Sequence, residues 1–588
     1  MLTINNVHEQ FASFFEGEKL KPFAYLVSKQ LSEGHICLNL NEIVTGEIEF
    51  PFHYQNLEDL EKDLRAEKLV GTSFEERQPF ILYNSHFYIQ RYFAYETLIL
   101  KRIERFLEKE ETELSRRKRE LLEQRELINE LFYTQESITH LSLEEQIDWQ
   151  QIACILATLN NFTMITGGPG TGKTTTTSKL LKILKRINPG LKVGLAAPTG
   201  KAARRLAESL EGEGSTTIHR LLKTIPNTHK FHHNEENPLH FDVIIVDEAS
   251  MIDVALFAKL LAAIGDDTRL ILLGDKDQLA SVEAGSLFRD LCLTRNRTNQ
   301  VTPETADFVN SFINDPQRML PASYSSDITR TVLTDHIIEL KRSRRFDSSK
   351  GIGKFSKAVI DNDVDQIREF IKARGSEQIY IDTDYSEKIF DECIEKYASF
   401  ITEPDIKKAL KKFDQFRVLC AIREGEYGLY HINKRIEDIL TIGGLIQPKQ
   451  EFYPNRPIII TRNYYDLDLY NGDVGIIRYN EEGELMAYFE NDDTLKVITP
   501  SLIAQCETVF AMTIHKSQGS EYDEVLIVLP QHEDLNLLTG ELLYTAITRA
   551  KQAVIVQANE ATLYATAKRQ VKRASGINER LKKKEQWD

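Results

Sequence analysis

The sequence contains no apolar run long enough to cross a bilayer, which excludes a helical membrane protein. Its start, MLTINNVHEQ, lacks the basic and apolar regions of a secretory signal, so we expect a cytoplasmic protein. Cysteine is scarce: the six residues are scattered, and no two of them form a CxxC pair. We therefore expect reduced, buried thiols rather than a zinc or iron–sulfur centre.

An excess of positive charge is also lacking, because the formal net charge is −16. A free-standing nucleic-acid binder is more often basic. Any contact with a strand must then be local, in a groove with its own Lys, Arg and backbone N–H groups. An acidic exterior also suits a subunit that relies on a larger complex. The length of 588 residues exceeds what one hydrophobic core serves and suggests about three domains.

Three regions differ in texture. Residues 1–135 indicate a helical N-terminal domain that could dock a partner. It ends in a highly charged stretch, 103–131, whose apolar residues form one buried helical stripe. The basic run at 116–119 could touch nucleic acid, although a solvated helix face is the simpler interpretation.

Residues 136–335 alternate short apolar strands with helical patterns, as in FTMITGG, KVGLAAP, FDVIIVDE and RLILLGD. This alternation predicts a parallel, doubly wound α/β sheet with its ligand site at the carboxyl ends of the strands. Polar residues and three prolines dominate 293–335, so we expect a long surface insertion there. A second α/β pattern fills 336–588, with a small β insert at about 445–505.

A glycine-rich motif follows the apolar strand FTMIT and precedes a helical run. It fits G-x-x-x-x-G-K-[ST], in which backbone N–H groups and the start of the next helix bind phosphates. Lys173 would supply charge to the terminal phosphates, and the Thr174 hydroxyl would ligate Mg²⁺. The residues expected to bind the nucleotide here are Gly167, Gly168, Pro169, Gly170, Thr171, Gly172, Lys173, Thr174 and Thr175.

Acidic and amide side chains follow two other predicted strands. Asp247 and Glu248 end the strand VIIV, where Asp247 would hold Mg²⁺ and Glu248 would deprotonate the attacking water. Gln278 lies in the run that follows LILL. The carboxyl end of that strand should face the γ-phosphate, so Gln278 is a candidate sensor of phosphate and water.

The chain resembles the superfamily 1 DNA helicases, and within them the RecD family. The segments that carry the resemblance occur in the family's order over about 400 residues: GGPGTGKTTT, APTGKAARRL, STTIHRLL, VDEASM, LLGDKDQLASVEAG, RRF, TIHKSQGSEYDEVLIV and YTAITRAK. FYIQRYFAYE, LCAIREGEYGLYHINKRIE and NGDVGI resemble segments of the RecD family in particular. The resemblance implies two tandem RecA-like P-loop domains.

The resemblance also implies roles for further residues. Gln150 resembles the residue that reads adenine, with Gln151 as the alternative. Arg345 resembles an arginine that reaches ATP from the second unit, with Arg344 as the alternative, and Arg549 resembles another such arginine. Eight residues lie in segments that touch single-stranded DNA or couple to it: Thr199, Lys201, Thr216, His219, Thr513, His515, Ser517 and Gln518. His219 and His515 could instead be packed core histidines.

The function implied by the resemblance is ATP- and Mg²⁺-dependent 5′-to-3′ translocation and unwinding of DNA in the repair of double-strand breaks. The expected partners are single-stranded DNA, duplex DNA ends, and RecB-like and RecC-like subunits in a heterotrimer. No nuclease-type carboxylate cluster is evident in the sequence, so the nuclease of such a complex is expected in the partner. Three alternatives are a stand-alone superfamily 1 helicase, a regulatory subunit that is not a motor, and an RNA helicase.

Overall fold

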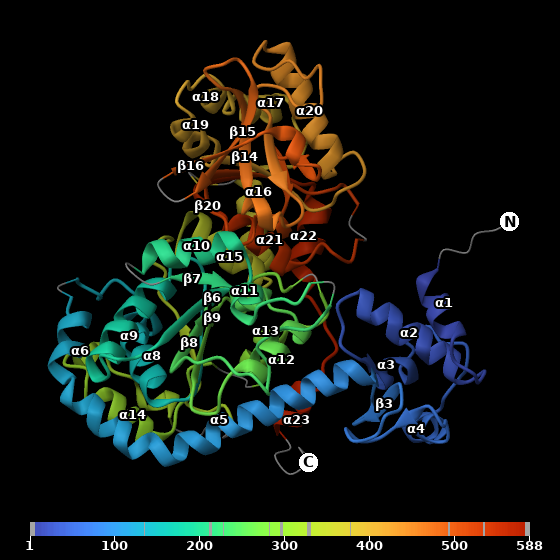
Figure 1. Cartoon of the computed structure of the whole chain (residues 1–588), viewed down its shortest axis with the longest axis vertical. Coiled ribbons are helices and arrows are strands. Elements are labelled where there is room, and N and C mark those ends of the chain that lie inside the picture. Colours follow the sequence, from blue (N-terminus) through green and yellow to red (C-terminus); the bar gives the residue numbers. More distant parts are fainter. Residues whose placement is uncertain are drawn as a thin grey trace.

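The computed structural model describes residues 6–582 except 135, 211–213, 227, 282, 295–297, 326–330, 375, 377, 492–493 and 533–534. It consists of an N-terminal unit, two α/β units and a β insert in the second of them (Figure 1). No helix in these ranges is long and apolar enough to span a membrane.

The N-terminal unit combines four helices with a small sheet of order β1-β4-β3-β2. Its helices are α1 (Val7–Ser13), α2 (Leu20–Ser32), α3 (Leu40–Val44) and α4 (Leu57–Arg65), and its strands are β1 (Leu38–Asn39), β2 (Val70–Gly71), β3 (Phe80–Tyr83) and β4 (His86–Ile89). Phe23, Phe80 and Phe87 lie at the centre of its core. The expectation of a helical domain did not include this sheet, because its strands are only two to four residues long.

One long helix, α5 (Gln90–Glu123), connects the N-terminal unit to the first α/β unit and runs along it (Figure 1). Phe93, Ile103 and Phe106 pack against one face of the first α/β sheet, whereas Leu121 belongs to the core on the other face. The expected domain boundary at 135 is thus wrong, since α5 already packs on both faces of the first α/β sheet before that residue. Arg117 is also not on a solvated face: it is buried and donates to Leu159 O at 2.7 Å.

The first α/β unit is built on a six-stranded parallel sheet of order β10-β5-β9-β8-β6-β7. Its strands are β5 (Phe162–Gly167), β6 (Val193–Ala197), β7 (Ser215–Thr217), β8 (Val243–Val246), β9 (Arg269–Gly274) and β10 (Ile337–Leu340). Successive strand residues alternate between two cores; Ile244 faces one and Ile245 the other. Helices therefore cover both faces, as a parallel sheet requires.

Helices on the two faces come from different parts of the chain. One face is covered by α5, α11 (Ile218–Leu222), α12 (Val254–Ala263) and α13 (Leu287–Cys292), and the other by α6 (Arg125–Phe132), α8 (Trp149–Leu159), α9 (Lys173–Ile187), α10 (Gly200–Ser209) and α14 (Pro303–Asn310). The short helix α7 (Leu143–Gln146) precedes α8.

Two sequence expectations about the end of this unit need correction. Strand β10 pairs in parallel with β5, so the unit extends beyond the expected boundary at 335. Residues 293–335 are not simply a surface insertion either, because Val309 and Phe312 are fully buried in the core beside α8. Polar residues between these apolar positions hid a helical spacing that buries one face of α14. Residues 295–297 and 326–330 of this segment lie outside the described residues.

The second α/β unit contains a five-stranded parallel sheet of order β11-β20-β19-β12-β18. Its strands are β11 (Ile379–Asp382), β12 (Phe416–Cys420), β18 (Ala511–Thr513), β19 (Tyr522–Val528) and β20 (Ala550–Gln557). The helices are α15 (Gly351–Ile360), α16 (Val364–Lys372), α17 (Glu387–Glu395), α18 (Ala398–Ile401), α19 (Ile406–Phe413), α20 (Leu429–Ile442), α21 (Gly540–Ile547) and α22 (Glu560–Lys568).

The β insert is a separate antiparallel sheet of order β16-β15-β14-β13-β17. It comprises β13 (Pro457–Ile460), β14 (Val474–Tyr479), β15 (Leu485–Asn491), β16 (Thr494–Ile498) and β17 (Cys506–Thr508). Two ion pairs join it to the first α/β unit: Arg204 contacts Asp473 at 2.6 Å, and Arg220 contacts Asp468 at 2.9 Å.

The end of the chain, residues 569–582, forms a C-terminal strap that leaves the second unit and returns to the first (Figure 1). Arg573 donates to Gly285 O at 2.7 Å, and Ile36 N of the N-terminal unit donates to Ala574 O at 2.9 Å. Its last helix, α23 (Ile577–Lys582), buries Ile577 against α5 and α13. The strap therefore joins all three units.

Replacing Arg580 in the strap by methionine should destabilise the first α/β unit by about 3 kcal/mol. Arg580 lies 3.7 Å from Glu96, and both side chains are almost fully buried. Burial raises the pKa of Glu96, and Arg580 counteracts that rise. Without Arg580 the folded-state pKa rises further, so the penalty should be full at pH 7 and shrink as Glu96 becomes protonated at lower pH.

Urea unfolding of the Arg580→Met variant at pH 7.5 and pH 5 measures this loss. Adding Glu96→Gln should recover most of the stability, because the unpaired charge is then removed. Equal losses at both pH values, or no recovery in the double variant, would contradict the role assigned to the pair.

Candidate active site

The glycine-rich loop lies between β5 and α9, at the carboxyl end of the first sheet. Gly170 and Gly172 have φ angles of 74° and 86°, which favour glycine. A Cβ at Gly172 would lie 2.3 Å from Gln150 Nε2, so no larger residue fits there. Lys173 Nζ donates to Gly167 O at 2.6 Å and to Gly168 O at 3.3 Å. The loop and the first turn of α9 form the floor of a cleft.

This cleft has a volume of about 330 Å³ and contains most of the residues that the sequence assigns to the nucleotide site. Its lining includes Pro169, Gly170, Gly172, Lys173, Thr174, Thr175, Asp247, Glu248, Gln278, Arg345 and Arg549. Both α/β units contribute to it, since Arg549 follows α21 of the second unit.

The two acidic residues follow β8 directly. Glu248 has a φ of 52°, in the left-handed region that non-glycine residues seldom adopt, and its N–H donates to Asp247 Oδ1 at 2.8 Å. Burial, and then the neighbouring Glu248 carboxylate, raise the pKa of Asp247 to about 6, against the opposing effect of Lys173. Such a desolvated carboxylate is stabilised by a cation at the same position.

Gln278 lies after β9 and is held by Asp275. Its Nε2 donates to Asp275 Oδ2 at 3.0 Å. Its Oε1 is buried, with no hydrogen-bond partner in the described structure. The amide oxygen is therefore free to accept a hydrogen bond from a ligand or a water in the cleft.

The arginines approach the cleft from different directions. Arg345 donates through Nη2 to Glu521 Oε1 at 2.7 Å, while its buried Nη1 has no hydrogen-bond partner in the described structure. Arg345 follows β10 of the first sheet, so it lies on the connection between the units and not within the second unit as expected. Arg549 is 3% exposed and donates to Thr545 O and Ser520 O.

Arg344 also lines the cleft, so the structure leaves both neighbouring arginines beside the phosphate loop. Its backbone N–H donates to Gly170 O at 2.8 Å. The unpartnered Nη1 of Arg345 is the feature that distinguishes the two.

Sequence reasoning missed Arg205 and Glu521, which form an ion-pair cluster with Arg345. Arg205 of α10 and Arg345 both contact Glu521. Although burial acts to raise it, the two guanidinium groups hold the pKa of Glu521 down to about 2. Arg205 lies in the same sequence motif as Lys201, and Glu521 lies in the same motif as Gln518. Spacing alone could not reveal that positions more than 300 residues apart form one ion-pair cluster.

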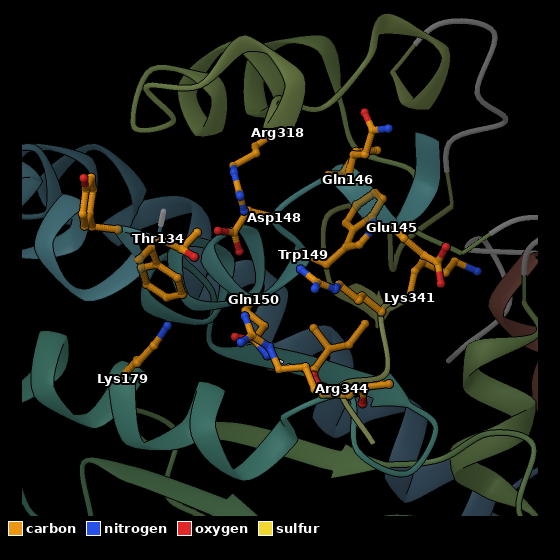
Figure 2. A pocket seen from close by; sticks show the side chains of 16 residues that line it. Thr134, Glu145, Gln146, Asp148, Trp149, Gln150, Lys179, Arg318, Lys341 and Arg344 are labelled. Carbon is orange, nitrogen blue, oxygen red and sulfur yellow. Dashed lines mark hydrogen bonds between the residues drawn. The ribbon is translucent and has the colours of Figure 1, made fainter. Parts of the chain in front are cut away.

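A second pocket of about 210 Å³ adjoins the glycine-rich loop (Figure 2). Gln150 lines it and donates through Nε2 to Thr171 O at 2.9 Å. Gln151 instead donates to Phe312 O at 3.0 Å and is buried away from the pocket. Figure 2 shows Gln150 beside Arg344, with Lys179 of α9 across from them. Gln150, and not Gln151, thus faces the space next to the phosphate loop.

The eight residues expected to contact single-stranded DNA differ in how exposed they are. Thr199 caps α10, and Lys201, Thr216 and His219 follow it at the edge of the first sheet, all at least partly exposed. In the second unit, His515 is partly exposed, whereas Thr513 is buried. Ser517 is fully buried and donates to Ile514 O, so it can only support the turn. Gln518 donates to Leu279 O of the first unit at 2.6 Å, which makes it a link between the units.

Three family models match parts of the chain: RecBCD enzyme subunit RecD, N-terminal domain, over residues 3–88; AAA domain over 150–284; and UvrD-like helicase C-terminal domain over 508–557. A RecBCD enzyme subunit RecD of Mycolicibacterium smegmatis is 36% identical, covering 74% of each chain. That of Haemophilus influenzae is 34% identical, covering 74% of this chain and 73% of the relative.

More distant similarities were also found. An ATP-dependent RecD2 DNA helicase of Deinococcus radiodurans is 30% identical, covering 66% of this chain and 46% of the relative. Among solved structures, the Pif1 helicase from Bacteroides in complex with ADP-AlF3 and ssDNA aligns with 73% of this chain and 94% of its own, at 16% identity and a TM-score of 0.37. The Pif1 helicase from Candida albicans aligns with 70% of this chain and 93% of its own, at 16% identity and a TM-score of 0.38.

Proposed function

This chain belongs to the family of the RecBCD enzyme subunit RecD, and on that premise we propose that it is the ATP-dependent DNA helicase subunit of a RecBCD-type enzyme, moving 5′ to 3′ along single-stranded DNA. The observation that carries the proposal is the cleft between two parallel-sheet units. One side presents Lys173 and the carboxylate pair, and the other presents Arg549. A triphosphate bound there is contacted by both units at once.

The nucleotide proposed for this cleft is ATP, with its phosphates on the backbone N–H groups of the loop and the start of α9. Thr174 and Asp247 are the residues that would hold Mg²⁺. A hydroxyl and a buried carboxylate whose pKa is raised by burial and by the neighbouring Glu248 suit a hard divalent cation. Such an ion supplies positive charge to the phosphate oxygens when bound.

Hydrolysis needs a group that takes a proton from water and groups that offset developing charge. Glu248 lies beside the phosphate loop and is proposed as the general base. Gln278 Oε1 would orient the water. Lys173, Arg345 and Arg549 would offset the negative charge that builds on the transferred phosphoryl group.

Movement follows from the two-sided grip on the nucleotide. Contacts from both units to the γ-phosphate stabilise the closed cleft. Release of the γ-phosphate after hydrolysis removes that stabilisation. If each unit holds the strand in turn, closing and opening advance the protein along it. Thr199, Lys201, Thr216, His219 and His515 are the proposed strand contacts.

The pocket beside the loop is proposed to take the adenine, with Gln150 reading its edge. Replacing Gln150 by alanine should raise the KM for ATP about tenfold, the value of one or two neutral hydrogen bonds, with a smaller change in kcat. Steady-state ATPase assays with ATP and GTP measure this. Gln151→Ala is the matched comparison: it should lower stability through the lost Phe312 contact and leave KM unchanged. The reverse pattern would transfer the role to Gln151.

The proposed partners are a RecB-like helicase–nuclease and a RecC-like subunit acting on broken duplex ends. The relatives are RecBCD subunits by name, and the match over residues 3–88 is to their N-terminal domain. DNA cutting is assigned to the RecB-like partner. The proposed location of the complex is the cytoplasm.

Two experiments test the proposal. Co-purification from the native host with mass spectrometry should recover RecB-like and RecC-like chains; a purified monomer that unwinds DNA unaided would favour a stand-alone helicase. ATP turnover should rise with single-stranded DNA more than with RNA, and duplexes with 5′ tails should be unwound in preference to 3′-tailed ones. ATP turnover that is unaffected by both single-stranded DNA and RNA would contradict the proposal that the chain is a motor.

A further inference from the structure

The Asp275 carboxylate receives hydrogen bonds from both α/β units. Asp275 follows β9 and is 1% exposed. Its Oδ1 accepts from Asp277 N at 3.0 Å, and its Oδ2 accepts from Gln278 Nε2 at 3.0 Å. The same Oδ2 accepts from the Tyr544 hydroxyl of α21 at 3.1 Å. Burial raises the pKa of Asp275 to about 6, so each donor helps to keep this carboxylate charged.

Tyr544 is also pressed against the phosphate loop. A Cβ built on Gly168 would lie 2.9 Å from the Tyr544 hydroxyl oxygen, which places the hydroxyl next to the loop backbone. Its neighbour Thr545 accepts from Leu279 N at 2.8 Å through Oγ1. Together with the Gln518 contact to Leu279 O, these bonds fix residues 275–279 of the first unit to the second.

The consequence reaches Gln278. Because its Nε2 is fixed on Asp275, its Oε1 is the end of the amide left to face a ligand or a water. The orientation of that oxygen depends on where the Asp275 carboxylate is held. One of the donors that hold Oδ2 comes from the second unit, so the orientation depends on the contact between the units.

We propose that Tyr544 is a positioning residue that makes water placement by Gln278 conditional on closure of the two units. In the closed cleft the hydroxyl donates to Asp275 and locks the Gln278 amide. When α21 moves away from the loop, Asp275 keeps only donors from its own unit, and the amide can rotate. Hydrolysis is thereby confined to the closed arrangement. This inference rests on the ATPase activity proposed above and adds the link that times it.

The test is Tyr544→Phe, which keeps the ring and removes only the hydroxyl. We expect kcat for ATP hydrolysis with saturating single-stranded DNA to fall about tenfold, and the KM for ATP to change less than about twofold. Tyr397→Phe is the matched control. It removes a buried hydroxyl of the same unit that donates to Phe510 O, outside the lining of the cleft, and should leave both constants unchanged.

A double variant separates positioning from general loosening of the site. If Tyr544 acts through Gln278, then Tyr544→Phe introduced into Gln278→Ala should lower kcat by less than about twofold further. An unchanged kcat in the single variant, or full multiplication of the two losses in the double variant, overturns the inference. Loss of strand-stimulated turnover in the wild-type chain would instead refute the proposed function, so the two failures are distinct.

Discussion

Replacing Glu248 by glutamine is expected to lower kcat for ATP hydrolysis by about 10²–10⁴-fold, the usual contribution of a general base, while ATP still binds. The amide cannot accept the proton from water. It also removes the repulsion that helps to raise the pKa of Asp247, so that carboxylate becomes easier to ionise and binding should not weaken. The measurement combines single-turnover hydrolysis with titration of a fluorescent nucleotide.

Glu208→Gln is the control for this variant, because Glu208 is an exposed residue near the end of α10, outside the cleft. It should hydrolyse ATP at the wild-type rate. A Glu248→Gln protein that turned over ATP within a fewfold of wild type would move the general base elsewhere, with Asp247 the next carboxylate to examine.

Replacing Lys173 by glutamine should abolish measurable turnover and leave the fold intact. The Lys173 ammonium contacts only the loop carbonyls of Gly167 and Gly168 in the described structure, so no core packing is lost. The variant lacks the charge that meets the terminal phosphates, so both turnover and closure of the cleft should suffer. ATPase with single-stranded DNA and the thermal unfolding midpoint are the two readouts.

Lys182→Gln, on the exposed side of the same helix, is the matched control and should behave as wild type. Near-normal turnover in Lys173→Gln would falsify the assigned phosphate site. A large fall in the unfolding midpoint would show that the lysine stabilises the loop itself. Comparison with Glu248→Gln then separates loss of binding from loss of chemistry.

The local features of the site could be predicted from the sequence because each is carried by contiguous residues. The phosphate loop needs glycines at fixed spacing, and Asp247-Glu248 ends an apolar strand whose carboxyl end must face the same edge. Parallel strands also leave a simple trace, since both faces are buried and the apolar runs are continuous.

Features that depend on distant pairing could not be predicted. Strand β10 looks like the start of the second α/β pattern, and only its pairing with β5 assigns it to the first. Gln150 and Gln151 are neighbours on α8, and the way α8 packs decides which of them faces the pocket. The sequence of α5 is that of one charged helix, although its two halves pack into the cores on opposite faces of the first α/β sheet.

The C-terminal strap has a consequence for the freedom of the second α/β unit. That unit is joined to the first at both of its ends: by the segment after β10, where Ser343 donates to Pro169 O, and by the strap, where Arg573 bonds Gly285 O. Attachment at these two points restricts how far the second unit can separate from the first and in which directions it can rotate. We therefore expect the easiest motion to be a rotation about the line through these two attachments, during which the contacts at Leu279 and at the β insert would have to change.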